Sequence, residues 1–197
     1  MDSKLIKEYA VELGAHACGI ADIARFENAP PGFHPQDVFS LCQSVVVFIK
    51  QMPTDVIFAE NPVPYTHAAY KMYEEIDKIA MELCRFFQIN HIKAVLIPAD
   101  VPYLSWDQQN MHGKGILSLK HSAVLAGLGI MGRNTIFINE TYGNMVYIGA
   151  LLIDAAVEAD PLVMDFKCPA SCRRCLDACP HGWYNGKSKA VPGKIVY

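Results

Sequence analysis

The sequence predicts an α/β protein that carries a small cysteine-rich module at its C-terminal end. Segments with the period of amphipathic helices alternate with short, apolar, β-branched segments, and four of the seven cysteines lie close together near the end of the chain. Of the 197 residues, 52% are hydrophobic and 19% are charged, which favours a buried core over disorder. We therefore expect a domain of helices and strands over residues 1–160 and a cysteine module over residues 161–197.

Each element of the first domain is predicted from its hydrophobic period. Helices are expected where apolar residues recur on one face, from a Ser3 N-cap to Gly14 and over residues 66–87 and 117–126. Segment 44–50 contains three consecutive valines and is expected to be a central strand. Residues 99–115 are polar and aromatic and are expected to form a loop. Further strands are expected from short apolar runs at residues 17–21, 93–98, 135–139 and 145–153.

The cysteine module predicts an iron–sulfur cluster. Cys168, Cys172, Cys175 and Cys179 have the spacing C-x3-C-x2-C-x3-C, and Pro180 follows directly. This run is one residue longer than the bacterial ferredoxin run. Closely spaced thiolates let one short segment wrap around a [4Fe–4S] cluster, whereas structural zinc is usually held by two ligand pairs with a longer spacer between them. We therefore expect these cysteines to be cluster ligands, with zinc as the alternative.

The number of clusters depends on the role of Cys179. In ferredoxin-type runs the fourth cysteine ligates a second cluster, which needs further ligands. Either all four thiolates hold one cluster, or the chain is a fragment of a two-cluster protein. Its end in the apolar, strand-like stretch 193–197 favours the fragment. The other cysteines, Cys18, Cys42 and Cys84, have apolar neighbours and are expected to be small buried side chains.

Charge is unevenly distributed along the chain. The net charge of the whole sequence is −3. Residues 167–197 carry a net charge of +5, and the rest of the chain carries −8. This basic segment can offset the negative charge of thiolate-bound iron, or it can form a docking face for an acidic electron donor or a phosphate-rich substrate. Its charged residues are Lys167, Arg173, Arg174, Asp177, Lys187, Lys189 and Lys194.

A glycine motif, G-x-G-x-x-G, covers residues 127–132. A dinucleotide site requires this motif to follow a strand and to open a helix. Here the predicted helix comes before the motif and a predicted strand comes after it, so a Rossmann site is not expected. The glycines are better explained by a helix C-terminus and a turn whose bare backbone permits close approach. The approaching group is either packed protein or a flat cofactor.

Segment 120–135, with its AGLGIMGRN run, the pair Tyr142-Gly143, segment 149–154 and the cysteine run together resemble the epoxyqueuosine reductase family. That family is related to reductive dehalogenases and to cobalamin-processing proteins with a nitroreductase-like core. The resemblance implies a nitroreductase-like mixed sheet with flanking helices, followed by a small ferredoxin-like module. The first helix and segment 44–50 also lie where the family has them.

The same resemblance implies a cytoplasmic oxidoreductase. Electrons from a low-potential donor such as ferredoxin or flavodoxin would pass through [4Fe–4S] clusters to cobalamin in the core. The substrate would be a modified tRNA base or, in a shorter relative such as this one, a small molecule. No apolar run is long enough to cross a bilayer, so no membrane partner is expected. The residues implied to lie against the corrin are Gly127, Leu128, Gly129, Gly132, Arg133 and Asn134.

The sequence departs from the family at the position of the acidic proton donor. The corresponding segment, 111–115, contains no carboxylate. Asp107, which is out of register, and His112 are the candidate proton donors, while His121 could face either the core or the cofactor. Two alternatives therefore remain beside the reductase. One is an electron-transfer or cobalamin-handling protein without a substrate of its own, and the other is a flavin (FMN) nitroreductase.

Overall fold

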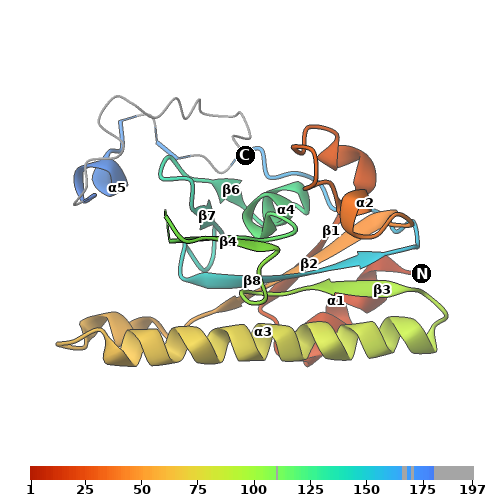
Figure 1. Ribbon diagram of the computed structural model, residues 1–197, viewed down its shortest axis with the longest axis horizontal. Coiled ribbons are helices and arrows are strands. Elements are labelled where there is room, and N and C mark those ends of the chain that lie inside the picture. The colour runs from red at the N-terminus through yellow and green to blue at the C-terminus, as the bar shows by residue number, and fades with distance from the viewer. Residues whose placement is uncertain (110, 166–167, 170, 180–197) are drawn as a thin grey trace.

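The computed structural model describes residues 1–109, 111–165, 168–169 and 171–179. These residues form a four-stranded sheet with helices on both faces (Figure 1). The strands lie in the order β1-β2-β8-β3, and every adjacent pair is antiparallel. Their bounds are β1 Ala17–Asp22, β2 Ser44–Gln51, β3 Ala94–Ile97 and β8 Val146–Ile153.

The position of β2 inside the sheet follows from its composition. Val45, Val46, Val47, Phe48 and Ile49 are all fully buried, because alternate side chains enter the apolar layers on the two faces of the sheet. A strand that is buried on both faces reads as a continuous apolar run. The prediction of a central strand at 44–50 is confirmed.

The sheet was expected to be mixed, but its strand pairs are all antiparallel because β8 lies between β2 and β3. β2 and β3 run in the same direction and are joined by a helical crossover, yet each of them pairs with β8. The insertion converts a parallel arrangement into two antiparallel pairs. Periodicity predicts that a segment is a strand but not which neighbour it will have, so the sequence did not reveal this order.

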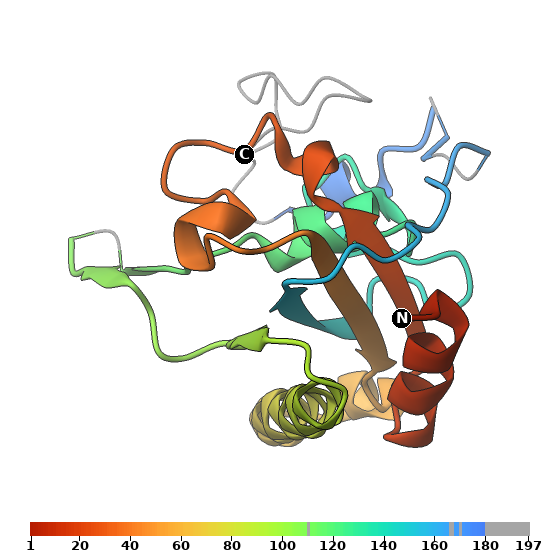
Figure 2. The same ribbon diagram turned by 90° about the vertical axis from the view of Figure 1, so that its right-hand side faces the viewer.

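One face of the sheet is covered by α1, Ser3–Glu12, and α3, Val63–Ile89, which Figure 2 shows beneath the strands. Ile6, Ile76 and Phe87 project from these helices and are fully buried. The N-cap of α1 is Asp2 rather than the predicted Ser3, since the Asp2 carboxylate accepts a hydrogen bond of 2.9 Å from the Lys4 amide. α3 begins three residues before the predicted start and ends two residues beyond the predicted end.

The other face is covered by shorter elements. The helix α4, Leu119–Leu125, confirms the helix predicted before the glycine motif. Between β1 and β2, where only a loop was expected, lie the 3-10 helix η1, Ile23–Phe26, and the one-turn helix α2, Pro35–Val38. After α4 the chain forms a two-stranded ribbon from β6, Ile130–Met131, and β7, Phe137–Ile138.

Four further short elements among the described residues were not predicted. Residues 99–115, expected to be a loop, contain a hairpin of β4, Ser105–Asp107, and β5, His112–Lys114, which extends from the body in Figure 2. All three residues of β4 are exposed, so no burial pattern marked this hairpin in the sequence. The 3-10 helix η2 covers Thr54–Phe58. α5, Arg174–Asp177, lies in the cysteine module.

Some expectations fall on residues outside those described. They are the proline after the last cysteine, most of the basic C-terminal segment and the strand-like stretch 193–197. Within the described ranges, no helix combines the length and the apolar character needed to cross a membrane.

Candidate functional site

The glycine loop, residues 127–135, begins at the C-terminal end of α4. Gly127 has φ +73° and directly follows the helix C-cap, Ala126. Its amide donates to the Val124 carbonyl and the Leu128 amide donates to the Ala123 carbonyl, both at 3.0 Å. A Cβ atom at Gly127 would overlap the carbonyl oxygen of Pro161. The close approach that this glycine permits is therefore to protein backbone.

The next two glycines are enclosed in the same way. A Cβ atom at Gly129 would overlap the Ile138 carbonyl oxygen and crowd the Phe137 ring, and one at Gly132 would crowd the Ile138 side chain. Protein atoms thus occupy the space that the missing side chains leave. The contact of this loop with a cofactor stays a prediction, and it would have to use other atoms of the loop.

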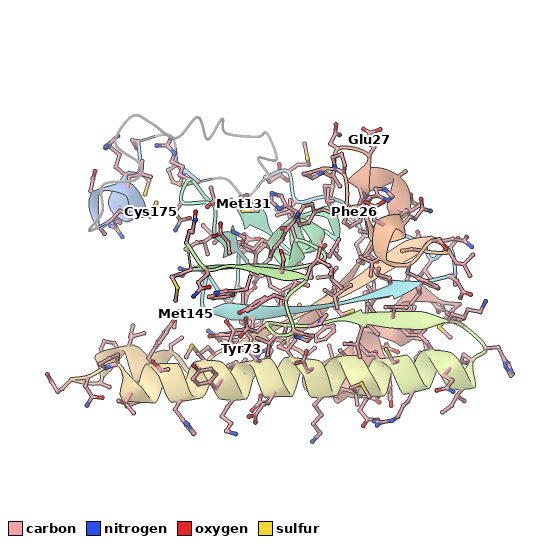
Figure 3. All side chains as sticks on the ribbon, viewed as in Figure 1. Phe26, Glu27, Tyr73, Met131, Met145 and Cys175 are labelled. Carbon is pink, nitrogen blue, oxygen red and sulfur yellow. The ribbon has the colours of Figure 1, made fainter. Side chains whose placement is uncertain are left out.

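A pocket of about 430 Å³ lies beside the glycine loop. This volume is within the usual range for small-molecule sites. Its wall combines the end of η1 and the following loop, the N-terminal part of α4 and two residues of the glycine loop. In Figure 3 the labelled side chains Phe26 and Met131 lie on the same side of the sheet. The lining residues are Phe26, Ala29, Pro30, Phe33, Leu117, Ser118, Lys120, His121, Met131 and Thr135.

The few polar groups of the pocket are held in place by short contacts. The Ser118 hydroxyl lies 2.6 Å from Nδ1 of His121, one helical turn away, and the His121 side chain is almost fully buried. The Lys120 ammonium donates to the Thr135 carbonyl at 2.9 Å, which ties α4 to the glycine loop. His121 therefore faces the pocket. Sequence reasoning singled out its position but could not choose between core and site.

The two predicted proton donors belong to the β4–β5 hairpin. Asp107 and His112 are paired in its backbone register, and Asp107 is not among the pocket-lining residues that the structure describes. The Asp107 carboxylate accepts a hydrogen bond from the Gln109 amide at 3.0 Å. Their role as proton donors stays a prediction. Sequence reasoning missed Ser118, although one signal was usable, since its spacing of three from His121 places both on one side of α4.

The four module cysteines are free thiols that are partly exposed. The Cys172 amide closes a turn by donating to the Pro169 carbonyl at 3.0 Å, and Cys175 lies in α5. Among the described residues, no three histidine, cysteine or acidic side chains form a group that could hold a metal ion. The structure therefore gives the identity and the chain path of the predicted ligands but not the geometry of a cluster.

Burial separates the other three cysteines from this set. It raises the pKa of Cys18 to about 12 and that of Cys42 to about 11, and it also raises the pKa of Cys84. Metal ligation requires the thiolate, so these environments disfavour it. Cys42 is fully buried, as predicted, whereas Cys18 and Cys84 are only partly buried as whole residues.

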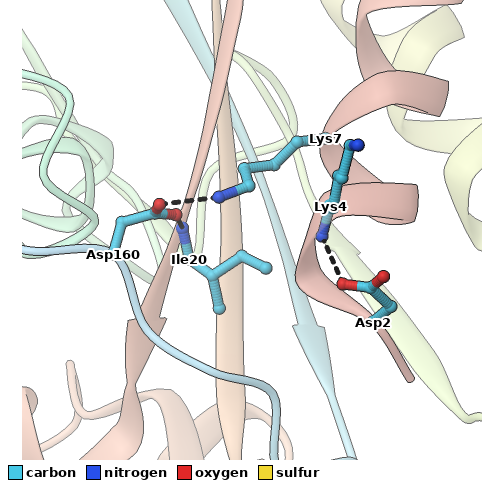
Figure 4. Close-up of polar contacts among 5 residues, drawn as sticks. All are labelled: Asp2, Lys4, Lys7, Ile20 and Asp160. Atoms are coloured by element: carbon cyan, nitrogen blue, oxygen red, sulfur yellow. Dashed lines mark hydrogen bonds and ion pairs between the residues drawn. The ribbon is translucent and has the colours of Figure 1, made fainter.

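The segment leading to the cysteine module is fixed to the core at Asp160. Its carboxylate accepts hydrogen bonds from the Lys7 ammonium at 2.7 Å and from the Ile20 amide at 2.9 Å (Figure 4). The Asp160 amide donates to the Ile20 carbonyl at 2.9 Å, so the segment pairs with β1. Pro161, the next residue, lies against Gly127.

A second contact joins the module to the glycine loop. Nη1 of Arg133 donates a hydrogen bond of 3.0 Å to the carbonyl of Cys172 in a partly buried position. Figure 3 shows Met131, a pocket residue, between Phe26 and Cys175 in that view. The pocket wall, the glycine loop and the first turn of the cysteine module therefore form a continuous chain of contacts.

Comparison with known proteins assigns this arrangement to a fold. Over 92% of the chain the structure superposes on an epoxyqueuosine reductase solved with a modified tRNA stem loop, with a TM-score of 0.68 and 20% sequence identity, covering 52% of that protein. A reductive dehalogenase associated with B12-dependent dehalogenation superposes over 90% of the chain, with a TM-score of 0.65 and 16% identity, covering 25% of that protein. The protein thus has the helix-and-sheet fold common to these two groups of enzymes.

Sequence relatives narrow the assignment. The chain is 37% identical over 159 residues to an epoxyqueuosine reductase of Listeria monocytogenes, a match that covers 80% of the chain and 38% of that protein. It is 41% identical over 198 residues to one of Cyclobacterium marinum, covering 90% of the chain and 62% of that protein. No protein-family model matches the chain. The chain is a relative of the epoxyqueuosine reductases, and it spans less than two thirds of the length of these two relatives.

Proposed function

We propose that the chain is an oxidoreductase in which the cysteine module passes electrons to a cofactor held in the helix-and-sheet core. The observation that carries this proposal is the Arg133–Cys172 contact, because it joins the predicted electron carrier to the loop that lines the pocket. An electron-transfer function requires the donor and the acceptor site to be close and fixed relative to each other. The relatives named epoxyqueuosine reductase support the reaction class.

The donor set fits an iron–sulfur cluster by its chemistry. Four thiols that are neither buried nor joined in disulfides lie on one turn-rich segment. Thiolates are the ligands that iron–sulfur clusters require, and the run contains no histidine. Cys168, Cys172 and Cys175 would hold one [4Fe–4S] cluster. Cys179 would complete this cluster or ligate a second one, in a module covering residues 161–197.

The pocket fits part of a corrinoid and not the whole molecule. A corrin macrocycle with its nucleotide tail is larger than a pocket of about 430 Å³, which is lined mostly by apolar side chains. In this proposal the pocket takes one apolar portion of cobalamin, and the backbone of residues 128–134 borders the rest. Bound cobalamin would supply a cobalt centre that accepts electrons and delivers them to the substrate. The core would then be nitroreductase-like, with its domain covering residues 1–160.

The chain's own residues exclude water from the pocket and supply a proton-carrying pair. Phe26, Phe33 and Met131 form its apolar wall. The Ser118 hydroxyl and Nδ1 of His121 share one proton position in their hydrogen bond. A ferredoxin or flavodoxin would donate the electrons in the cytoplasm. The substrate would be a modified tRNA base, of the kind carried by the tRNA stem loop solved with one structural relative, or a small molecule.

One observation favours a second candidate, an electron-transfer or cobalamin-handling protein. Asp107, one of the two sequence-predicted proton donors, is on the β4–β5 hairpin and is not among the pocket-lining residues that the structure describes. An FMN nitroreductase has less support. The phosphate of FMN needs basic partners, and Lys120, the one lysine or arginine among the lining residues that the structure describes, is bonded to the Thr135 carbonyl.

Anaerobic reconstitution of the full chain tests the proposal. Iron analysis, visible spectra and electron paramagnetic resonance (EPR) should reveal a [4Fe–4S] cluster, and added cob(II)alamin should change the cobalt spectrum. FMN should bind at least about tenfold more weakly. A protein without iron, or one that binds FMN in preference to cobalamin, contradicts the proposal. Turnover of an epoxide by the reduced protein would exclude the candidate without a substrate.

A pair of methionine variants links cofactor binding to the pocket. Met131→Trp fills the pocket and should weaken cobalamin binding about tenfold, since overpacking a site costs about 1–3 kcal/mol. Met81→Trp adds the same side chain at an exposed position of α3, on the opposite face of the sheet, and should leave binding unchanged. Equal affinities for the two variants would place the corrinoid outside this pocket.

A further inference from the structure

Arg133 lies in the middle of segment 131–135, which borders the pocket and also contacts the cysteine module. Met131 and Thr135, two residues before and after it, line the pocket. Arg133 reaches the cysteine module and donates to the carbonyl of Cys172 at 3.0 Å. The same five residues therefore contact the cofactor pocket on one side and a predicted cluster ligand on the other.

Internal contacts fix this segment. The Gly132 amide donates to the Ile136 carbonyl and the Thr135 amide donates to the Gly132 carbonyl, both at 2.9 Å. Lys120 on α4 holds the Thr135 carbonyl, and Thr135 itself has φ +60°, a conformation seldom adopted by threonine. A segment with so many restraints holds the base of the Arg133 side chain in one place.

Arg133 also differs from the charged residues of the module itself. Arg173 is exposed and lies 3.3 Å from the Asp177 carboxylate, so solvent screens its charge. Arg133 belongs to the glycine loop and not to the cysteine module, and its guanidinium is partly buried where it contacts Cys172. A positive charge in such a position acts on the module with less screening than a surface charge.

We propose that Arg133 is a positioning residue for the cluster: it anchors the turn that carries Cys172, and its charge raises the reduction potential of the cluster bound there. This inference rests on the proposed function, because it requires a [4Fe–4S] cluster on the module. On reduction the cluster takes one electron from an external reductant, and no bond is made or broken. The reduced cluster carries one more negative charge, so a nearby cation stabilises it relative to the oxidised cluster. The corrin contact that the resemblance implies for Arg133 stays a prediction for its backbone, while its side chain contacts Cys172.

A redox titration of the reconstituted full chain tests the inference. Arg133→Gln removes the charge, and the equilibrium constant for one-electron reduction by dithionite, followed by EPR, should fall about tenfold, or about 59 mV. Arg133→Lys keeps the charge and should stay within about threefold of the wild type. Arg85→Gln removes one positive charge on the exposed side of α3, where Arg85 pairs with Glu82, and should leave the potential unchanged.

Each outcome separates this inference from the proposed function. A wild-type protein that assembles no cluster overturns both. If the wild type shows the cluster signal and Arg133→Gln has an unchanged potential, the inference is overturned and the proposed function stands. If Arg133→Lys shifts the potential as far as Arg133→Gln does, the charge is not the cause, which also overturns the inference. Iron content and thermal unfolding of each variant show whether the cluster and the fold are intact. Failure of both Arg133 variants to hold iron, with the wild type loaded, would overturn the inference as stated, because Arg133→Lys is expected to keep both the cluster and its potential.

Discussion

The two faces of the sheet are both apolar, but they are covered in different ways. On one face α1 and α3 pack their buried side chains against Ile20, Val46 and Phe48 in a single cluster. On the other face α4, η1 and the glycine loop pack against Val45, Val47 and Leu152. The pocket and the contact to the cysteine module belong to the second face.

The difference shows how element length determines where a site can form. The 27-residue helix α3 buries one continuous apolar stripe from Met72 to Phe87, which seals the first face of the sheet. The seven residues of α4 cannot cover the second face, and turns complete it. Those turns leave a pocket between them and bring polar groups, Ser118 and His121, to its wall. The first face therefore provides stability, and the second provides the site.

The largest expected effect comes from opening the sealed face. Phe87 is fully buried in α3, so Phe87→Ala leaves a cavity and should lower the free energy of unfolding by about 3–5 kcal/mol, measured by urea denaturation. Ile89→Ala, two residues further along, removes an exposed side chain and should change it by less than about 0.5 kcal/mol. Similar losses for both variants would mean that α3 does not seal this face as described.

A smaller effect is expected at the start of the glycine loop. Gly127→Ala strains a residue with positive φ and drives a Cβ atom into the Pro161 carbonyl, so it should cost about 2–4 kcal/mol. Gly143→Ala is the matched control, because Gly143 has φ +64° and no atom within 4 Å of the added Cβ. Its cost should be about 1–2 kcal/mol. If the two costs agree in thermal unfolding, the packing of Pro161 on the loop contributes nothing.

The contacts that hold the segment before the cysteine module should contribute less to the free energy of unfolding than the packing at Gly127 does. Asp160→Ala removes the ion pair with Lys7 and the hydrogen bond from Ile20, and it should cost about 2 kcal/mol. Asp160→Asn keeps an acceptor for the Ile20 amide and should cost about 1 kcal/mol. Limited proteolysis should also cut residues 154–165 faster in the alanine variant. An unchanged cleavage rate would show that this carboxylate does not hold the segment.

The smallest effect is expected inside the pocket. Ser118→Ala removes the hydroxyl that contacts His121 and should lower the free energy of unfolding by about 1 kcal/mol. Its effect on cobalamin-dependent turnover at saturating cofactor should be larger than its effect on stability, if the pair carries a proton. A loss of stability with full turnover would reduce the pair to a structural role.

Sequence patterns predicted the central strands of the sheet and the helix of the sealed face better than the elements of the open face. Burial in a large core produces the apolar runs at 44–50 and 145–153 and the long stretch of helical periodicity in α3. Hydrophobic periodicity detects such burial directly. The glycine loop depends on contacts with Pro161 and Ile138, and the β4–β5 hairpin is exposed. Neither feature leaves a periodic signal.

The candidate site was predicted unevenly for the same reason. The four module cysteines are recognisable because ligand chemistry fixes their type and spacing, and the structure places them on one segment without testing their role as ligands. The contribution of Phe26 and Phe33 to the pocket could not be predicted, since roughly ninety residues separate them from α4 and only the fold brings them together. Arg133 was recognised by resemblance, but its contact with Cys172 depends on how the module returns to the core.

The position of β8 between β2 and β3 also constrains the order of folding. In the β2–β8 pair, Ser44 lies opposite Ile153 and Gln51 lies opposite Val146. Roughly a hundred residues therefore separate the partners along the chain. During synthesis β1, β2 and α3 leave the ribosome first, but the sheet cannot close until β8 follows. Loop closure over this distance slows folding, and the edges of β2 and β3 stay unpaired meanwhile. Until β8 pairs with β2 and β3 and completes the core, the unpaired edges of these two strands therefore expose the nascent chain to aggregation.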